Sequence, residues 1–489
     1  MNIAASAQTL LERLGRPYES LLHLARNREL YMVGGTVRDI VLGRDPTDFD
    51  FAVRGSGIDF ARALARRLRA NLVLLSEPDD QARVVVRLGT RTRASAARSD
   101  NSTFILDFNG FNTGTIRDDL ERRDFTANAI ALRISTDRKP PELLDPFHGQ
   151  QAIRDRRLIP VSERSLELDP LRLLRAIRFA LELGFEIDET ILHQARGISL
   201  EHIAPERIGY ELMRIMACDK SYRHVRLLYQ MGFLLQILPE ARPLLTHREL
   251  MRHSLGTYRK LEQLISRSSF FSLFQPEFEA YFATHPHSRA LLKLAGLLHD
   301  IGKPETEFIN DQHEVHFYGH DALGARRVAA LARDRLRLAR DEIKVLKTLV
   351  EYHMRLHLLA TGPSLTDRAI RRYFRDLGEQ WFGLMMLTFA DGFATAGVTR
   401  HLETKFAQMI ELKRQYDAVV KIERLVNGHD LIRLGLRPGP QFKTILTELE
   451  ELQIEGRITS KEQGLDYIRT NLARLNARPE AESGSESLP

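Results

Sequence analysis

The sequence predicts an α+β protein in which a small mixed α/β head precedes a long all-helical body. Short β-like runs separated by turns occupy about residues 29–160. From about residue 166 onward, almost every segment has the apolar period of a helix, and no β-rich block returns. A chain of 489 residues is also too long for a single core, which favours two to four domains.

The first segment, residues 1–28, is expected to form one short helix because its leucines make a rough apolar stripe. Helical patterns are also expected at 58–69 and near 125–133, as helices that flank a small mixed sheet. The polar, arginine-bearing stretch 90–102 has the composition of a mobile loop. The clearest strand candidates are 31–33, 49–53, 84–88 and 104–108.

Composition is that of an ordinary globular protein of the reducing cytoplasm, with 43% hydrophobic and 28% charged residues. Cys218 is the only cysteine, so neither an intrachain disulfide nor a cysteine zinc cluster is expected. The sequence shows no signal-peptide pattern at its start, and its apolar stretches are too short for a membrane span. The net charge of +6 is compatible with an anionic partner without indicating one.

Asp48 and Asp50 are the first residues that indicate chemistry. Alternate side chains of a strand share a face, so both carboxylates are expected to project together while Phe49 packs behind them. Paired carboxylates attract divalent cations, and Mg²⁺ prefers hard oxygen ligands together with substrate phosphates. Asp107, on a later predicted strand, is either a third ligand or a carboxylate that faces solvent. Taken alone, such an Asp-x-Asp triplet is more often a solvated face.

Gly34 and Gly35 directly follow the predicted strand 31–33. A strand that ends in two glycines and opens a helix leaves backbone N–H groups free to cradle a phosphate. The alternative is a tight strand–helix turn in which Thr36 caps the helix. Because Gly34 lies fourteen residues before Asp48, the two features together favour a phosphate site beside the carboxylates.

Four motifs in order resemble those of the class II tRNA CCA-adding enzyme and bacterial poly(A) polymerase family. They are VGGTVRDIVLG at 33–43 with DFD at 48–50, DLERRDFTANA at 119–129, LDPFHG at 144–149 and DPLRLLRAIRF at 169–179. The resemblance covers roughly residues 28–470. It implies a polymerase-β-like nucleotidyltransferase head that extends the 3′ end of an RNA, above all tRNA, from ATP and CTP.

The resemblance also implies roles for single residues. Asp48 and Asp50 would hold two Mg²⁺, which can serve the attacking and leaving oxygens of an in-line displacement, and Asp107 is the third candidate catalytic residue. The second motif is expected at the start of a helix, where arginine suits a triphosphate because its planar fork makes two charge-assisted bonds. The third motif is interpreted as structural, shaping a hinge between head and body. The nucleotide-binding residues would be Gly34, Gly35, Arg38, Arg123, Asp124, Asn128, Asp169, Arg172 and Arg175.

Asp169 and Arg172 are expected to open a helix and to share one of its faces. Asp169 as N-cap and Pro170 at the first helical position would be a purely structural account. Cytosine and adenine, however, both present an amino donor beside a ring-nitrogen acceptor, which a carboxylate and a guanidinium match. Uracil and guanine reverse that order and would leave buried polar groups unpaired, which costs about 1–3 kcal/mol of binding free energy per group. The family often has a glutamate directly before this aspartate, which helps to orient the arginine. Here the residue is Leu168, so the nucleotide choice stays open.

Residues from about 250 to 400 resemble an HD phosphohydrolase domain. Imidazoles and carboxylates together can bind one or two divalent metals, here Ni, Mn, Mg or Fe, and activate water. Any one of these histidines alone is more often a core or surface residue. The candidate ligands, in the order H…HD…H…H…D, are His253, His299, Asp300, His320, His353 and Asp391.

The C-terminal stretch that begins with GHDLI at 428–432 resembles the tail module of HD-bearing bacterial tRNA nucleotidyltransferases. The expected organisation is an N-terminal helix 1–28, a head 29–160, a helical neck 161–245 that binds nucleobase and RNA, an HD domain 246–400, a helical tRNA-binding tail 401–475 and a disordered tail 476–489.

The leading hypothesis is a cytoplasmic enzyme that adds C, A or both to the 3′ end of tRNA, with no DNA and no membrane as partner. An enzyme that adds only CC or only A, and a poly(A) polymerase, share the same head chemistry. Two hypotheses come from other classes: an HD phosphohydrolase with a vestigial head, and a non-catalytic RNA-binding protein. Intact Asp48, Asp50 and Arg123 argue against the first, and the two carboxylates, which would repel phosphate without metal, argue against the second.

Overall fold

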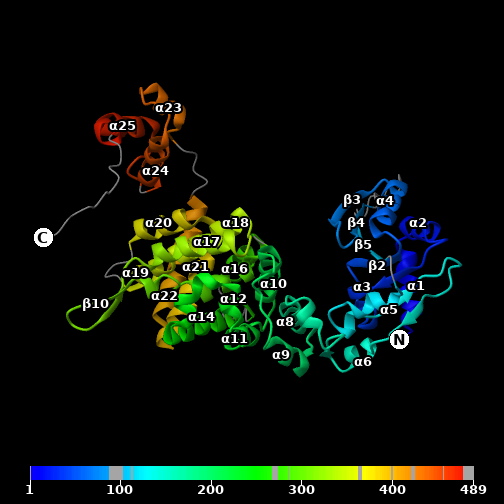
Figure 1. Ribbon diagram of the computed structural model, residues 1–489. Helices are drawn as coiled ribbons and strands as arrows, with labels where there is room; N and C mark the ends of the chain where they lie inside the picture. The colour runs from blue at the N-terminus through cyan, green and yellow to red at the C-terminus, as the bar shows by residue number, and fades with distance from the viewer. Residues whose placement is uncertain are drawn as a thin grey trace. The chain divides into compact units, whose positions relative to one another are not determined.

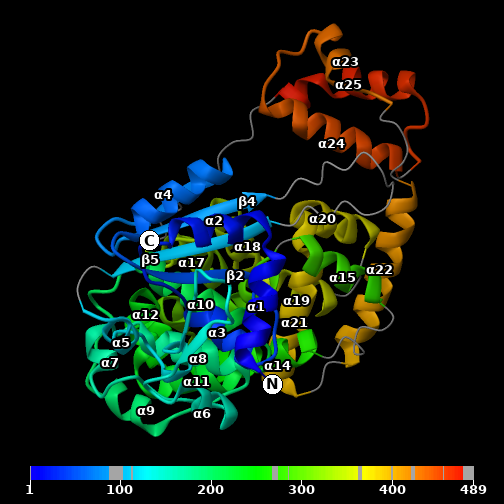
Figure 2. The ribbon, with the colours of Figure 1, turned by 90° about the vertical axis from the view of Figure 1, so that its right-hand side faces the viewer.

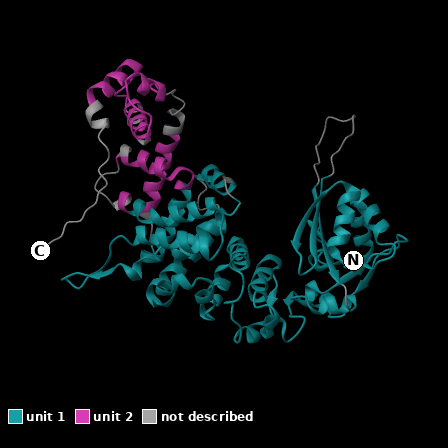
Figure 3. Ribbon diagram, turned by 45° about the horizontal axis from the view of Figure 1, so that its top comes forward, with its two compact units in different colours: residues 1–357, 382–398 teal, residues 358–381, 399–489 magenta. Residues whose placement is uncertain are grey.

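The protein is described by a computed structural model that places residues 2–87, 103–111, 114–266, 274–284, 286–361, 366–397, 400–419, 425–454 and 456–476. The loop expected at 90–102 lies outside the described residues, as does the tail expected to be disordered, apart from its first residue. The chain forms two compact units, residues 1–357 with 382–398 and residues 358–381 with 399–489 (Figure 3).

The N-terminal segment forms two helices, α1 (Ile3–Arg13) and α2 (Arg16–Leu24), so the prediction of a single helix was wrong (Figure 1). Gly15 separates them with φ of +62°, a left-handed conformation that favours glycine. Pro17 then lies in the first turn of α2, where its missing N–H costs no helical hydrogen bond.

The head contains a seven-stranded sheet in the order β3-β4-β5-β2-β1-β6-β7. Only the central pair, β2 with β5, is parallel, and the other pairs are antiparallel. The strands are β1 (Leu30–Val33), β2 (Asp48–Arg54), β3 (Asn71–Ser76), β4 (Gln81–Arg87), β5 (Thr103–Phe111), β6 (Ala131–Arg133) and β7 (Glu142–Leu144). The described residues of all four predicted runs lie in strands, which confirms the mixed sheet.

The head helices are α3 (Gly34–Val41), α4 (Gly57–Leu68), α5 (Ile116–Glu121), the 3₁₀ turn η1 (Thr126–Asn128) and α6 (Gly149–Arg154). The helix predicted at 58–69 is confirmed as α4, which covers one face of β4 and β5 (Figure 2). The helix predicted near 125–133 is wrong. That segment forms η1 and then β6, because Ala131 and Leu132 pair with β1 and are fully buried there, so tertiary pairing overrides the local pattern.

The centre of the head core explains how β2 presents its carboxylates. Phe49 and Phe51 are buried at 2% and 0% exposure, and the Phe51 ring stacks on Phe108 of β5 with centroids 5.2 Å apart. Side chains alternate along a strand, so Asp48 and Asp50 point to the opposite face. The prediction that Phe49 packs behind the two aspartates is therefore confirmed.

Helices make up most of the described chain after the head. A short parallel pair, β8 (Arg157–Leu158) with β9 (Glu186–Ile187), and a hairpin, β10 (Glu307–Ile309) with β11 (Val315–Phe317), are the strands described there. The helices that carry the sites are α7 (Ser165–Leu168), α8 (Arg172–Leu183), α10 (Pro205–Ala217), α11 (Tyr222–Gln230), α14 (Arg248–Ser266), α16 (Ser288–Leu298), α17 (His320–Asp334), α19 (His353–Thr361) and α21 (Trp381–Ala396).

The second unit contains α20 (Asp367–Leu377), α22 (Arg400–Val419), α23 (Gly428–Arg433), α24 (Pro440–Ile454) and α25 (Lys461–Asn476). Its C-terminal helices enclose a core of their own, with Leu431, Ile445 and Ile468 almost fully buried. None of the described helices combines the length and apolarity that a membrane crossing requires.

Candidate active site

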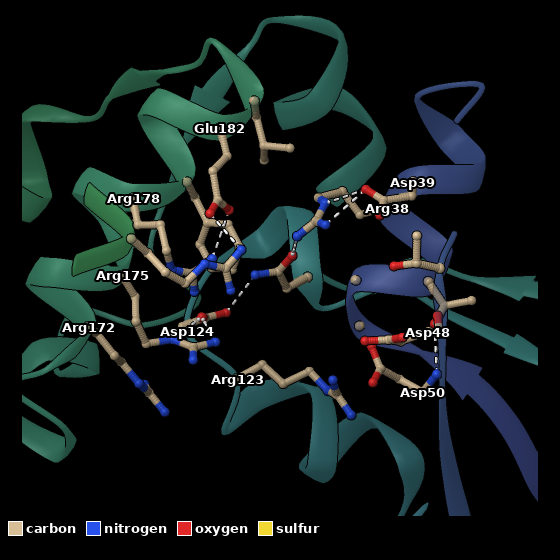
Figure 4. A pocket seen from close by; sticks show the side chains of 18 of the residues that line it. Arg38, Asp39, Asp48, Asp50, Arg123, Asp124, Arg172, Arg175, Arg178 and Glu182 are labelled. Atoms are coloured by element: carbon tan, nitrogen blue, oxygen red, sulfur yellow. Dashed lines mark hydrogen bonds and ion pairs between the residues drawn. The ribbon is translucent and has the colours of Figure 1, made fainter. Parts of the chain in front are cut away.

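A cavity of about 700 Å³ lies where α3, β2, the turn after α5, α8 and α10 meet. Figure 4 shows Asp48 and Asp50 on one side of it, with Arg172, Arg175 and Arg178 on the other. Every residue predicted from the sequence to bind the nucleotide lines this cavity, together with both aspartates of β2. Asp107 does not line it.

Asp107 nevertheless shares the face of the two aspartates, because it pairs with Asp50 in the parallel register of β2 and β5. Its carboxylate accepts two hydrogen bonds from Arg83, from Nε to Oδ1 and from Nη2 to Oδ2, both 2.8 Å long. Part of its acceptor capacity is therefore already used, and its role as a third metal ligand stays a prediction.

The electrostatics of the two aspartates suit a cation. Burial raises the pKa of Asp48, and although Arg83 lowers it, the charge of Asp107 adds to the rise. Burial also raises the pKa of Asp50, against the lowering effect of Arg123 and with a further rise from Asp107. Clustered carboxylates with raised pKa values gain from a divalent cation, which favours their charged forms. The residues present thus fit a Mg²⁺ site.

The turn between β1 and α3 brings backbone close to the carboxylates. Gly34 has φ of +67°, and a Cβ placed on it would lie 2.9 Å from Nη1 of Arg123 and 3.1 Å from Oδ2 of Asp50. The alternative interpretation, in which Thr36 caps the helix, is wrong, because the N-cap of α3 is Val33. Thr36 Oγ1 instead donates to the Asp48 carbonyl at 3.1 Å and accepts from the Asp50 N–H at 2.7 Å.

A chain of side-chain hydrogen bonds crosses the cavity wall from α3 to α8. Arg38 Nη1 donates to Asn128 Oδ1 at 3.0 Å, and Asn128 Nδ2 donates to Asp124 Oδ1 at 2.9 Å. Asp124 Oδ2 accepts from Nε and Nη2 of Arg175 at 2.9 and 2.7 Å. The guanidinium groups of Arg38 and Arg175 also lie over the ring of Phe179.

Asp124 is buried, and burial by itself raises a carboxyl pKa. Here Arg175, Asn128 and the Phe125 N–H outweigh that effect, so the pKa of Asp124 is lowered. The expected position of this motif at a helix start was wrong, because Arg123 and Asp124 lie between α5 and η1. Their position is fixed instead by the hydrogen bonds described above.

Asp169 and Arg172 both line the cavity, but the helix begins later than expected. The first residue of α8 is Arg172 and its N-cap is Leu171, so Asp169 is not the cap. Its Oδ1 accepts from the Leu171 N–H at 3.1 Å, a bond within the turn, and Pro170 lies in that turn before the helix.

The third motif has the structural role that the sequence indicated. Asp145 accepts from the N–H groups of Gly149 and Gln150 at 2.6 and 3.0 Å, and so satisfies the start of α6. A Cβ on Gly149 would lie 2.2 Å from the Thr126 carbonyl oxygen, so only glycine fits this contact. The hinge that this motif was expected to shape stays a prediction.

The six candidate HD residues come together although they span α14, the end of α16, α17, α19 and α21. They form two groups, and within each group the ligand atoms lie within 4.8 Å of one another. One group is His253, His299 and Asp391, and the other is Asp300, His320 and His353.

The ring nitrogens of this cluster are arranged for a metal. Nδ1 of His299, His320 and His353 each lies 2.6–3.0 Å from a backbone carbonyl, of Gly296, Phe317 and Val350 respectively. A proton on each Nδ1 makes that bond and leaves Nε2 with a free lone pair. These Nε2 atoms face the centre, with His320 and His353 3.1 Å apart there.

Asp300 provides a second indication of a metal. Both of its oxygens are buried and lack a hydrogen bond, although Lys303 Nζ lies 2.8 Å from Oδ2 as an ion pair. Burial alone would lower the pKa of His299, but the negative charges of Asp300 and Asp391 raise it to about 10. A buried carboxylate surrounded by imidazole rings, with Lys303 as its ion-pair partner, fits a divalent cation.

The side chains at these sites that sequence reasoning missed include Arg178, which lines the cavity, and four others. Arg207 bonds to Asp169, Ser165 bonds to Arg172, Arg214 lines the cavity, and Nε2 of His357 lies 3.1 Å from Oδ2 of Asp391. His357 lies one helical turn after His353, a spacing that could have identified it. Arg207, Arg214 and Ser165 had no comparable local signal.

Three family models match the chain in succession. The model described as "Poly A polymerase head domain" matches residues 30–159, "Probable RNA and SrmB- binding site of polymerase A" matches 184–245, and "HD domain" matches 250–381. The domain boundaries predicted from the sequence stay predictions beside these matches.

Curated relatives match nearly the whole chain. An A-adding tRNA nucleotidyltransferase of Deinococcus radiodurans is 30% identical over 90% of this chain and 94% of its own length. A CC-adding tRNA nucleotidyltransferase of Thermus thermophilus is 30% identical over 90% and 93%. A multifunctional CCA protein of Xanthomonas oryzae pv. oryzae is 30% identical over 86% and 96%.

Solved structures share the fold. A Thermotoga maritima CCA-adding enzyme complexed with tRNA aligns with a TM-score of 0.57 and 20% identity, covering 95% of this chain and 98% of that one. A CCA-adding enzyme in complex with CTP aligns with a TM-score of 0.60 and 21% identity, covering 96% and 98%. At this identity the likeness establishes the architecture of head and helical body.

Proposed function

This chain belongs to the tRNA nucleotidyltransferase family, and we propose that it adds C, A or both from CTP and ATP to the 3′ end of tRNA, with release of pyrophosphate. The family membership makes it an enzyme of nucleotidyl transfer. A tRNA substrate is also the reason to expect it in the cytoplasm, and neither DNA nor a membrane is needed as a partner.

The observation that carries this proposal is the cavity itself. Asp48 and Asp50 lie on one wall, the glycine turn of α3 lies beside them, and arginines line the other side. Such a cavity suits a nucleoside triphosphate, whose phosphates need both divalent cations and guanidinium donors. Asp169 and Arg172 line it as well and can pair with the amino group and ring nitrogen of the base.

We infer that Asp48 and Asp50 hold Mg²⁺, which when bound supplies positive charge to the attacking 3′-oxygen and to the leaving pyrophosphate. The chain's own residues do the rest. The backbone of Gly34 and Gly35 approaches the triphosphate, and Arg123 contributes charge next to it. The bonded chain from Arg38 to Arg175 keeps the cavity wall rigid, so that the base meets a preformed surface.

The test is a primer assay. The full chain is incubated with tRNA that ends at the discriminator base, at C or at CC, with each triphosphate separately, and the products are sequenced. Addition of CCA, of CC, of A or of a long A tail are four distinguishable products. The similar identity to an A-adding and a CC-adding relative makes this the decisive measurement of nucleotide choice.

Asp50→Ala should abolish every extension product, because it removes a carboxylate that no neighbour replaces. Asp45→Ala is the matched control: Asp45 is an exposed aspartate five residues away that pairs with Arg13 at the surface. Extension by Asp50→Ala at the wild-type rate would show that the site is assigned wrongly.

The HD cluster supports a second activity, a metal-dependent phosphohydrolase. We infer that His253, His299 and Asp391, with Asp300, His320 and His353, hold one or two divalent metals, which when bound supply an activated water. The buried Asp300 carboxylate, which lies among the histidine Nε2 atoms of both groups, is the specific observation that favours it. Whether Ni, Mn, Mg or Fe is held is decided by measurement.

Metal analysis tests this site separately from the head. Wild-type protein loaded with each metal in turn should retain it after desalting, and Asp300→Asn should lose most of it while primer extension continues. Equal metal content in both proteins would contradict the assignment. Release of phosphate from a 2′,3′-cyclic phosphate substrate then reports hydrolysis.

A further inference from the structure

The base-selecting pair, Asp169 and Arg172, has partners from other elements of the neck. The residue before the pair, Leu168, is 64% exposed and has no polar atom in its side chain, so it can position neither of them. Asp169 lies between α7 and α8, where a free carboxylate would rotate among several rotamers. Something else must fix the direction of its oxygens.

Arg207 of α10 meets that need for Asp169. Its Nη2 donates to Oδ2 of the carboxylate at 2.8 Å, while Oδ1 accepts from the Leu171 N–H at 3.1 Å. One bond on each oxygen fixes the plane of the group. A carboxylate has about four lone-pair sites, so about two remain to accept from the amino group of a base.

Ser165 of α7 has the same relation to Arg172. The serine is fully buried, and its Oγ donates to the Asp124 carbonyl at 3.1 Å. It accepts in turn from Arg172 Nη1 at 2.8 Å, and the same Nη1 donates to the Ser165 carbonyl at 3.2 Å. Nη2 donates to the Arg122 carbonyl. Of the five N–H groups of the guanidinium, Nε–H and one on Nη2 are left for a ring nitrogen.

We propose that Arg207 and Ser165 are positioning residues for nucleotide choice, Arg207 acting through Asp169 and Ser165 through Arg172. This inference rests on the proposed nucleotidyl transfer. A guanidinium only donates, so Arg207 keeps Asp169 as an acceptor, and the Ser165 contacts fix the direction in which the Arg172 guanidinium donates. Cytosine and adenine match this fixed order, whereas uracil and guanine oppose it. Once the side chain of Asp169 or Arg172 is free to rotate, uracil and guanine should lose less binding free energy relative to cytosine and adenine.

The test compares kcat/KM for each of the four triphosphates on the tRNA primer. Arg207→Ala should lower the preference for the favoured nucleotide over UTP or GTP by about ten- to a hundredfold, the loss expected for a charge-assisted hydrogen bond. Arg207→Lys should restore part of the preference, because an ammonium still reaches one oxygen. Ser165→Ala should relax the preference in the same direction.

Arg157→Ala is a closely matched control. Arg157 donates to Oδ2 of Asp188 at 2.6 Å, while Oδ1 of Asp188 accepts from the Thr190 N–H. The side chains of Arg157 and Arg207 are similarly exposed, at 51% and 50%. This pair does not line the cavity. Removal of the Arg157–Asp188 pair should leave nucleotide preference unchanged, even if the melting temperature falls as much as in Arg207→Ala.

The outcomes separate this inference from the function beneath it. A wild-type protein that extends no primer overturns the proposed function. A wild-type protein that extends primers, with Arg207→Ala and Ser165→Ala that slow all four nucleotides equally or none of them, overturns the positioning roles alone. Reduced preference in both variants, with partial recovery in Arg207→Lys, supports them.

Discussion

At the scale of one residue, Asp124 determines how the wall of the cavity is built. Its two oxygens receive Arg175 from α8 and Asn128 from η1, and the bond from Asn128 continues to Arg38 of α3. The carboxylate is buried and ionised, since its partners keep its pKa below the ordinary value. A group of this kind stabilises the fold and shapes the site through the same contacts.

Asp124→Asn should therefore destabilise the protein by about 1–3 kcal/mol at pH 7, because a buried partner is lost. A lowered folded-state pKa contributes stability that is fully present above the unfolded value of about 3.9 and is lost as pH falls through the folded value. The difference in free energy of unfolding between wild type and variant should stay constant from pH 7 to pH 5 and become smaller below about pH 4. Thermal unfolding across this range measures it.

Asp59→Asn is the control, since the Asp59 side chain is 64% exposed beside Arg62 and surface pairs contribute about 0–1 kcal/mol. A gap for Asp124→Asn that widens as the solution is acidified would contradict the assigned protonation state.

At the scale of elements, the position of β2 against α3 decides where the two carboxylates lie. Thr36 makes this connection, because its hydroxyl bonds both the carbonyl of Asp48 and the N–H of Asp50. The side chain is 1% exposed, so water cannot take over either bond. One hydroxyl thus links the turn proposed to bind phosphate to the strand that carries the proposed metal ligands.

Thr36→Val keeps the shape of the side chain and removes both hydrogen bonds. We expect a loss of about 1–3 kcal/mol for each backbone group left without a partner. Primer extension should fall more than in Thr36→Ser, which keeps the hydroxyl. Melting temperature and kcat are the measurements, and equal kcat values for the two variants would argue against a role for this link in placing the carboxylates.

At the scale of the whole molecule, the neck is joined to the HD helices through a buried charge within the first unit. Lys293 of α16 is 1% exposed and donates to the Cys218 carbonyl at the end of α10, to Ser221 and to Glu262 of α14. Glu262 also accepts from the Tyr222 N–H at the start of α11. Four helices therefore meet at one ion pair.

Lys293→Met should destabilise the protein by about 3–5 kcal/mol, because Glu262 is left as a buried charge without its partner. Adding Glu262→Gln should recover part of that loss, since the uncompensated charge disappears. Chemical denaturation measures both. Arg289→Met on the same helix, whose pair with Asp219 is exposed, should change stability by about 0–1 kcal/mol. If the double variant lost as much free energy of unfolding as Lys293→Met and Glu262→Gln lose together, this account would be contradicted.

The sequence by itself determined what depends on neighbours along the chain. The alternation of Asp48, Phe49 and Asp50, the glycine turn and the helix α4 follow from local periods and turn preferences, and all three have the predicted form. The four motifs in order were also sufficient to indicate the family, because each is a local pattern and their spacing is read directly from the chain.

Only the tertiary structure decided what depends on distant partners. Strand pairing with β1 made 131–133 a strand, Arg83 took both oxygens of Asp107, and Arg207 reached Asp169 across 38 positions. The six HD residues were predicted from their order along the chain, but only the structure brought their ligand atoms together around buried Asp300. The physical reason is that hydrogen bonds and ion pairs form between atoms that are close in space, whereas local sequence rules extend over about one helical turn.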